Sequence, residues 1–286
     1  MEDIVVIEGL VKKYGDKPAV DGLDLRVRKG EIFGFLGPNG AGKTTTVRVI
    51  ASLTDFSEGT VKIGKYDIKS ETRKAKRMIG VIQQNISLDK DLTVRENIVY
   101  QAMLQKIPAS ERTKKIKELC DYVEMNEYLD RKIDSLSGGW KKRAAIVCSL
   151  VHNPEILFLD EPTAGLDVQA RRLLWDIIHK LNDNGTTIFL TSHYIEEVEY
   201  LCDRVGVINH GKLIALGTPP ELCERVGFST VEYYAQDKKT YYKYFQTREE
   251  ANDFASTLDV SNTITIRNTS LEDCFVELTG KTVEGR

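Results

Sequence analysis

Short apolar runs recur along the first 210 residues, and segments with helical periodicity separate them. Runs of four or five apolar residues are typical of buried parallel strands, whereas longer amphipathic segments between them indicate helices. The expected strands are 32–36, 156–159, 186–190 and 205–208, and the expected helices are 44–53, 168–181 and 195–201. This alternation predicts an α/β fold with a mostly parallel sheet that is covered on both faces.

Two regions depart from this alternation. Three N-terminal segments read as strands, the last of them as a short edge strand: 4–10, 23–27 and 61–63. From Thr93 the pattern becomes helical, and Glu96 three residues later completes a capping box with Thr93 as the N-cap. Segment 109–125 is charged and amphipathic and is also expected to be a helix. The sequence therefore predicts a β-rich N-terminal part and a helical subdomain over about 88–150.

The pattern changes again after Thr218, where two prolines interrupt the chain. The segments that follow are an expected short helix at 221–226, a hairpin of 231–235 and 240–245, a helix at 248–258, a strand at 263–267 and a helix at 270–279. We therefore expect a first domain over 1–226 and a C-terminal α+β extension over 227–286. The extension is too short to bury much apolar surface by itself.

Composition and charge narrow the function classes. Of the 286 residues, 41% are hydrophobic and 29% are charged, and the net charge is −3. A chain of this charge lacks the clustered basic surface that nucleic acids require, so no nucleic-acid partner is expected. The apolar runs are too short to cross a bilayer, and the first residues do not resemble a signal peptide. The five cysteines are widely spaced and are expected to be reduced thiols.

The strongest chemical signal is the glycine-rich segment between the strand at 32–36 and the helix at 44–53. Glycines allow successive backbone N–H groups to point at phosphate oxygens, while Lys43 can reach the β- and γ-phosphates and Thr44 can bind Mg²⁺. The alternative is a glycine-rich turn before a helix. The expected nucleotide-binding residues are Gly37, Pro38, Asn39, Gly40, Ala41, Gly42, Lys43, Thr44 and Thr45.

Two further segments could act on a bound phosphate. Asp160 and Glu161 follow an apolar strand, at the edge where open α/β sheets bind ligands. One carboxylate there can hold Mg²⁺ and the next can polarise an attacking water, although many strands simply end in a polar loop. The segment Ser137, Gly138 and Gly139 opens a helix and could bind an anion, or it could be an N-cap with a tight turn.

Together these segments resemble the ATP-binding subunit of an ABC transporter. GPNGAGKT matches the phosphate loop of that family, and LSGGW matches its signature motif apart from the last residue. ILFLDEP matches the strand that carries the magnesium and catalytic carboxylates, and AGLD matches the D-loop. The four motifs stand in the family's order. The resemblance covers about residues 1–220. It implies a P-loop NTPase core with an antiparallel β subdomain and a helical subdomain, and an ATPase that uses ATP and Mg²⁺.

The resemblance also implies roles for individual residues. Those residues are Tyr14 for stacking on adenine, Gln84 for joining Mg²⁺ and the attacking water to the membrane partner, Thr44 and Asp160 for Mg²⁺, Glu161 as catalytic base, Asp167 in the D-loop and His193 for contacting the γ-phosphate. Trp140 occupies the fifth signature position, where the family usually has glutamine. A contact of that glutamine near the nucleotide sugar is therefore in doubt, and Trp140 could stack or pack instead.

The family resemblance implies two kinds of partner. The signature motif of one copy would complete the ATP site of a second copy in a head-to-tail homodimer. A separate membrane permease would hold the subunit at the cytoplasmic face of the membrane. An ABC importer and a soluble translation-type or repair-type ATPase are the alternatives to an exporter.

The tail segment 269–280 resembles the ending of multidrug and daunorubicin-resistance export ATPases, whose permeases are of the ABC-2 type. Its last helix either docks on the first domain or serves regulation or dimer stability.

Overall fold

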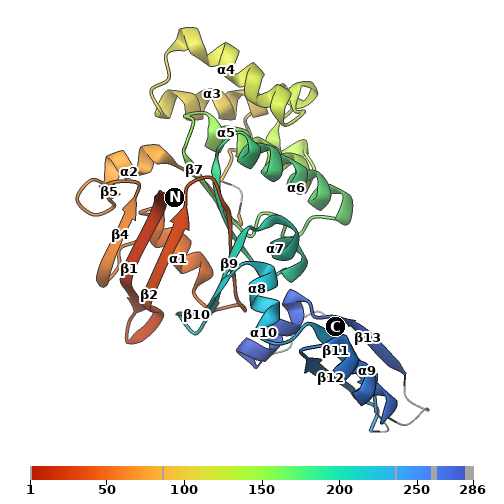
Figure 1. Ribbon diagram of the computed structural model, residues 1–286. Coiled ribbons are helices and arrows are strands. Elements are labelled where there is room, and N and C mark those ends of the chain that lie inside the picture. Colours follow the sequence, from red (N-terminus) through yellow and green to blue (C-terminus); the bar gives the residue numbers. More distant parts are fainter. Residues whose placement is uncertain (1, 86, 236, 259–262, 281–286) are drawn as a thin grey trace.

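The computed structural model describes residues 2–85, 87–235, 237–258 and 263–280, and its centre is a six-stranded sheet (Figure 1). The strand order is β10-β9-β3-β8-β7-β6, and all neighbours are parallel except β10 and β9. The strands are β3 (Ile32–Leu36), β6 (Ile79–Ile82), β7 (Ile156–Asp160), β8 (Thr187–Ser192), β9 (Arg204–Asn209) and β10 (Lys212–Gly217). The predicted α/β class and the mostly parallel sheet are confirmed.

Alternate residues of the central strands enter two different hydrophobic cores, because successive side chains on a strand point to opposite faces. Leu157 and Leu159 face the core that contains α5 (Gly138–Leu150), α6 (Val168–Asp183) and α7 (Ile195–Leu201). Phe158 faces the other core, where its ring lies 5.3 Å from that of Phe189, which also contacts two further phenylalanines. Both faces of the sheet are therefore covered, as the apolar runs predict.

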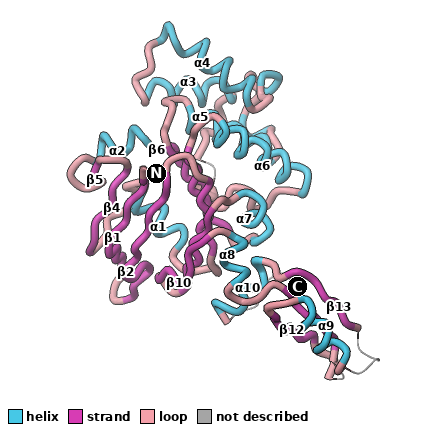
Figure 2. The backbone as a smooth tube through the Cα atoms, in the orientation of Figure 1, coloured by secondary structure: helices cyan, strands magenta, loops and turns pink. Residues whose placement is uncertain are grey.

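The second core lies between the central sheet and an antiparallel sheet of order β2-β1-β4-β5. These strands are β1 (Asp3–Tyr14), β2 (Lys17–Arg28), β4 (Glu58–Ile63) and β5 (Tyr66–Asp67), and α1 (Lys43–Ile50) packs in the same core. The expectation of an edge strand at 61–63 is wrong, because β4 pairs with β1 on one side and with β5 on the other. In Figure 2 the strands of both sheets stand side by side.

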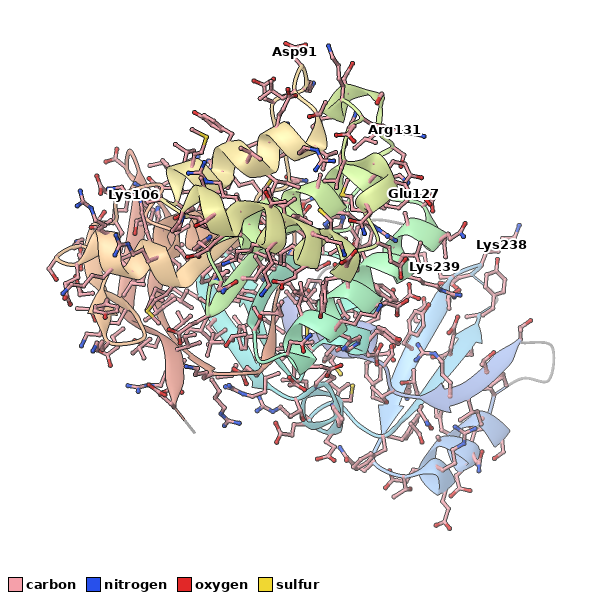
Figure 3. All side chains as sticks on the ribbon, turned by 90° about the horizontal axis from the view of Figure 1, so that it is seen from above. Asp91, Lys106, Glu127, Arg131, Lys238 and Lys239 are labelled. Atoms are coloured by element: carbon pink, nitrogen blue, oxygen red, sulfur yellow. The ribbon has the colours of Figure 1, made fainter. Side chains whose placement is uncertain are left out.

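The helices α3 (Val94–Leu104) and α4 (Ala109–Tyr122) form a layer with α5 at the top of Figure 1. The predicted capping box is present, since Thr93 accepts from the backbone of Glu96 and the Glu96 carboxylate accepts from the backbone of Thr93. Two short 3₁₀ helices, at Asn126–Tyr128 and Ile133–Ser135, connect α4 to α5. Figure 3 shows charged residues on the outside of this layer, among them Lys106 and Glu127.

The C-terminal part is a three-stranded antiparallel sheet of order β12-β11-β13 with α9 (Arg248–Ser256) against it. Its strands are β11 (Ser229–Tyr234), β12 (Thr240–Phe245) and β13 (Ile264–Asn268), so the predicted hairpin is confirmed. The last helix, α10 (Leu271–Thr279), packs on α7 and on α8 (Pro219–Glu224). Leu271 and Phe275 thereby join the core of the first 226 residues, which favours the docking interpretation of this helix.

Besides the two 3₁₀ helices, four elements have no counterpart in the sequence analysis, namely the strands β5 and β6, the edge strand β10 and the helix α2 (Thr72–Met78). Within the described residues every helix is too short or too polar to span a bilayer.

A carboxylate anchors the start of α10 to the neighbouring strand. Asp273 accepts two hydrogen bonds from the guanidinium of Arg267, at 2.6 and 2.8 Å, and two from the backbone N–H and hydroxyl of Ser270. Burial raises the pKa of Asp273, but the hydrogen bonds from Arg267 and Ser270 outweigh that effect and hold the pKa below its ordinary value. At any pH at which Asp273 is ionised in the unfolded chain, it is therefore also ionised in the folded protein.

We expect Asp273→Asn to lower the free energy of unfolding of the C-terminal part by about 2 kcal/mol at pH 7, because it removes charge-assisted hydrogen bonds. Since the folded pKa is depressed, the stabilisation is present above about pH 4 and is lost as the pH falls through the folded pKa. Thermal unfolding and hydrogen exchange of α10 at pH 7 and pH 3 measure the difference. The exposed Asp253→Asn is the control, and an equal effect of both variants would contradict the prediction.

Candidate active site

The glycine-rich segment forms a tight loop between β3 and α1. Gly42 is the N-cap of α1 and has a left-handed backbone with φ of 111°. A Cβ atom at Gly42 would lie 2.4 Å from the carbonyl oxygen of Ala19, and one at Gly37 would lie 2.4 Å from that of Ile208. Side chains are therefore excluded at both positions, and the backbone N–H groups at the start of α1 stay accessible to an anion.

Lys43 lies inside this loop, with a side chain only 5% exposed. Its Nζ donates to the carbonyl oxygens of Gly37, at 2.7 Å, and of Pro38, at 3.3 Å, and lies 3.7 Å from Oε1 of Glu161. Burial lowers the pKa of Lys43, and attraction to the Glu161 and Asp160 carboxylates opposes this shift. The loop thus holds an ammonium group where a phosphate chain would lie against the helix N-terminus.

Asp160 faces two hydroxyl groups at the end of β7. The Thr44 hydroxyl donates to Oδ1 of Asp160 at 3.2 Å, and the Thr191 hydroxyl donates to the same oxygen at 2.6 Å. In-register pairing of β7 and β8 sets Asp160 directly opposite Thr191. A hydroxyl and a carboxylate on adjacent elements are hard oxygen ligands of the kind that Mg²⁺ takes beside substrate phosphates. Thr44 and Asp160 therefore fit the magnesium role that the family resemblance implies.

Glu161 has a strained backbone, with φ of 48°, which is uncommon for a residue with a side chain. Its N–H is held by the carbonyl and the hydroxyl oxygens of Thr191, each at 3.1 Å. Its Oε2 accepts from Nε2 of Gln84 at 3.0 Å, and its Oε1 lies 3.2 Å from Nδ1 of His193. The strained turn therefore aims the carboxylate between the two other predicted catalytic side chains.

A cavity of 220 Å³ lies over the loop, and Ala19 of β2 forms part of its wall. Among the predicted site residues, it is lined by Asn39, Gly40, Gly42, Lys43, Thr44, Thr45, Gln84 and Glu161. Asp160 and His193 contact this group through Thr44 and Glu161. One chain thus brings together the predicted phosphate loop, the two carboxylates, Gln84 and His193.

The signature segment does not line this cavity. Ser137 is an exposed N-cap of α5, and its hydroxyl makes no capping hydrogen bond. Gly138 and Gly139 lie near Leu166 and Ala170, where a Cβ atom would come within 3.4 and 3.2 Å of their side chains. Asp167, the predicted D-loop residue, accepts from the N–H of Ala170 and caps the N-terminus of α6.

Trp140 stacks within its own chain. Its ring lies 3.9 Å from the ring of Tyr128, at an interplanar angle of 25°, and the Arg143 guanidinium lies 4.5 Å from its centre. Arg131 lies over Tyr128 in turn, at 4.9 Å. Trp140 therefore packs α5 against the 3₁₀ helix Asn126–Tyr128, as the stacking or packing alternative expects.

Tyr14 lies at the end of β1 and is 52% exposed, with the Lys12 ammonium 4.8 Å from its ring. It is not in the cavity wall, although the next strand supplies Ala19 to that wall. Its predicted stacking on adenine stays a prediction.

Three residues that contact the site have no role in the sequence analysis. Ala19 and Thr191 are described above, and the third is Lys142, whose Nζ donates to the backbone carbonyl oxygen of Gln84. In the sequence, the only sign of Thr191 is its position two residues before His193. Its hydrogen bond to Asp160 depends on the pairing of β8 with β7, which the sequence does not show. Neither Ala19 nor Lys142 carries a local motif that signals its contact.

The parallel sheet, the glycine loop and the carboxylates at one sheet edge define a P-loop NTPase. Residues 20–164 match the ABC transporter family. The chain belongs to that family and is an ATP-binding subunit of an ABC transporter.

Three relatives carry names that refer to export or resistance. The chain is 43% identical over 224 residues, covering 78% of it and 72% of the relative, to the linearmycin resistance ATP-binding protein LnrL of Bacillus subtilis. It is 37% identical over 297 residues, covering 96% of each chain, to the Nod factor export ATP-binding protein I of Burkholderia thailandensis. It is 42% identical over 232 residues, covering 81% of it and 70% of the relative, to the daunorubicin/doxorubicin resistance ATP-binding protein DrrA of Streptomyces peucetius. The resemblance to resistance-type export ATPases is confirmed.

Among solved structures, the dimeric bacterial ABC transporter cassette MJ0796 is similar, with a TM-score of 0.68 and 27% identity. The similarity covers 75% of this chain and 98% of that cassette.

We expect Lys43→Ala to reduce ATP hydrolysis by at least about 100-fold, because the variant loses the ammonium that would neutralise developing phosphate charge. Release of inorganic phosphate at saturating ATP measures the effect. Lys29→Ala, which removes an exposed lysine paired with Glu155, is the control and should keep its activity. Turnover of Lys43→Ala close to that of the control would refute the assignment of the loop.

Proposed function

We propose that this chain hydrolyses ATP to power an ABC exporter through a separate membrane permease. The observation that carries the proposal is the convergence of Lys43, Thr44 and Glu161 on one cavity. Asp160 bonds to Thr44, and Gln84 and His193 lie beside Glu161. The export and resistance names of the three relatives favour an exporter over an importer. They also argue against a translation-type or repair-type ATPase.

In the proposed mechanism the loop 37–45 binds the triphosphate, with Lys43 on the β- and γ-phosphates. When bound by Thr44 and Asp160, Mg²⁺ would supply positive charge to the phosphate oxygens. Glu161 orients and polarises the attacking water, and Gln84 holds the Glu161 carboxylate in place. His193 contacts the γ-phosphate. Catalysis of this kind depends mainly on positioning and electrostatic stabilisation.

The position of the signature segment supports a homodimer. Ser137, Gly138 and Gly139 lie outside the cavity of their own chain, at an exposed helix N-terminus that can bind an anion. In a head-to-tail pair, this terminus would meet the γ-phosphate bound by the other copy, and ATP would join the two surfaces. Hydrolysis would then remove the bridge and reopen the dimer. The dimeric cassette among the similar structures supports the same arrangement.

A surface of apolar side chains is the proposed binding site of the permease. Tyr100, Met103 and Leu104 of α3 and Leu53 after α1 are each more than half exposed. A 250 Å³ cavity beside them is lined in part by Leu53 and by Gln83, the neighbour of Gln84. A permease segment that binds there would therefore contact the loop of Gln83 and Gln84, and the Gln84 side chain donates to Glu161.

We further propose that the permease is of the ABC-2 type and holds the subunit at the cytoplasmic face of the membrane. Residues 1–226 would be the ATPase domain and 227–286 the accessory domain, whose last helix is anchored on α7 and α8. A role of this domain in regulation or dimer stability is compatible with that anchoring.

We expect Glu161→Gln to keep ATP binding but to lower turnover by at least about 100-fold, because the amide cannot accept a proton from water. ATP should then trap a dimer, which size-exclusion chromatography detects. Adding Ser137→Arg to this variant should abolish the dimer, since a large cation would fill the signature surface, whereas Ser110→Arg should leave it intact. A monomer with ATP, or a dimer that tolerates Ser137→Arg, would sink the head-to-tail proposal.

We expect Leu104→Glu to leave the basal ATPase rate within about two-fold, because Leu104 lies outside the cavity. It should abolish the stimulation of ATPase activity by the permease, since a buried charge at the contact is costly. The assay compares phosphate release with and without a co-reconstituted ABC-2 permease. Ile214→Glu, on the partly exposed strand β10, is the control. Undiminished stimulation of the Leu104 variant would exclude this surface.

A further inference from the structure

A buried lysine joins the signature helix to the loop that carries Gln84. Lys142 lies on α5, five residues after Ser137, and is only 5% exposed. Its Nζ donates to the backbone carbonyl oxygen of Gln84 at 3.1 Å. Lysine is rarely buried to this extent unless its ammonium group is bound. Its neighbour Lys141 is less buried and donates to the carbonyl oxygen of Asp134 instead.

The surroundings of Lys142 are acidic. Burial lowers the pKa of Lys142, and the carboxylates of Asp160, Glu161 and Glu197 oppose this shift. These carboxylates come from β7, the turn after it and α7. The ammonium group thus lies in the field of the same carboxylates that the active site uses, while its hydrogen bond goes to the loop.

Two consecutive hydrogen bonds lead from α5 to the predicted catalytic base. Lys142 holds the main chain of Gln84, and the Gln84 side chain donates to Glu161 at 3.0 Å. Of the loop residues that the structure describes here, Gln83, Gln84 and Asn85 belong to neither a helix nor a strand. A contact to its main chain therefore has more influence on the position of the Gln84 side chain than it would in a regular element.

We propose that Lys142 is a positioning residue that couples the two ATP sites of the dimer. The inference rests on the proposed head-to-tail pairing, in which the signature end of α5 serves the ATP bound by the second copy. Engagement of Ser137, Gly138 and Gly139 with that ATP shifts or fixes α5. Through its hydrogen bond, Lys142 transmits this change in the position of α5 to Gln84 and hence to Glu161. Glu161 acts on the water that attacks the ATP bound by its own chain.

The coupling has a chemical requirement that separates it from simple packing. Methionine at position 142 matches the unbranched stem of lysine but has no donor for the Gln84 carbonyl. Arginine keeps the charge and supplies donors, but from a planar group with a different reach. A packing role predicts that methionine is tolerated, and a coupling role predicts that arginine is the better replacement.

The test measures ATP hydrolysis against ATP concentration for the full chain and for Lys142→Met, Lys142→Arg and the control Lys141→Met. We expect Lys142→Met to lower kcat by about 10- to 100-fold, as displacement of a group that positions a catalytic residue does. The Hill coefficient for ATP should fall towards 1, while the affinity of the monomer for a fluorescent ATP analogue changes by less than about two-fold. Lys142→Arg should recover part of kcat and of the Hill coefficient, and Lys141→Met should match the unmodified protein.

A second readout does not depend on activity. In the Glu161→Gln background, hydrogen exchange of a peptide covering 79–88 should slow when ATP forms the dimer, and adding Lys142→Met should remove most of that slowing while the dimer persists.

If Glu161→Gln alone stays monomeric with ATP, the head-to-tail proposal fails. If it dimerises but Lys142→Met keeps the unmodified Hill coefficient and exchange, the coupling inference fails by itself. Should Lys142→Met unfold, Lys142→Leu takes its place, because leucine also fills the buried site and also has no donor for the Gln84 carbonyl. An unchanged kcat, Hill coefficient and exchange in that variant would overturn the inference.

Discussion

The in-register parallel pairing of β3, β8 and β7 is the constraint on which the active site depends. It places Leu36 opposite Ser192 and Asp160 opposite Thr191, so that the three strands end within one residue of each other. The glycine loop, the two carboxylates and His193 follow directly from those three ends. A slip of one residue would turn every side chain of a strand to the opposite face, and Asp160 would leave Thr44. The two hydrophobic cores hold this register, because alternate residues of each strand must reach different cores.

Much of this arrangement could be predicted because its signals are local. The phosphate loop needs glycines at fixed spacing beside a strand and a helix, and the capping box at Thr93 needs two residues three positions apart. The elements that escaped prediction have weak local signals. The helix α2 buries only Ala75, and β10 is a partly exposed edge strand. The roles of Thr191 and Lys142 arise from contacts across 31 and 58 residues of sequence, which no short motif reports.

The signature motif illustrates how one unusual residue can be accommodated. Trp140 turns onto Tyr128 and lies against Arg143, while the serine and glycines before it stay at the helix N-terminus. Trp140 therefore contributes to the packing of the helices around the motif. The serine and glycines that the resemblance assigns to phosphate binding lie at the start of α5.

The last helix has a consequence for how this chain could have changed in evolution. Leu271, Cys274 and Phe275 are buried in the same core as residues of α7 and α8, so α10 is part of the interior that these helices share. Loss of α10 would expose apolar side chains of α7 and α8, and α7 begins two residues after His193 along the chain. A shortened chain without α10 would therefore need polar residues in place of the apolar ones that α7 now buries against it.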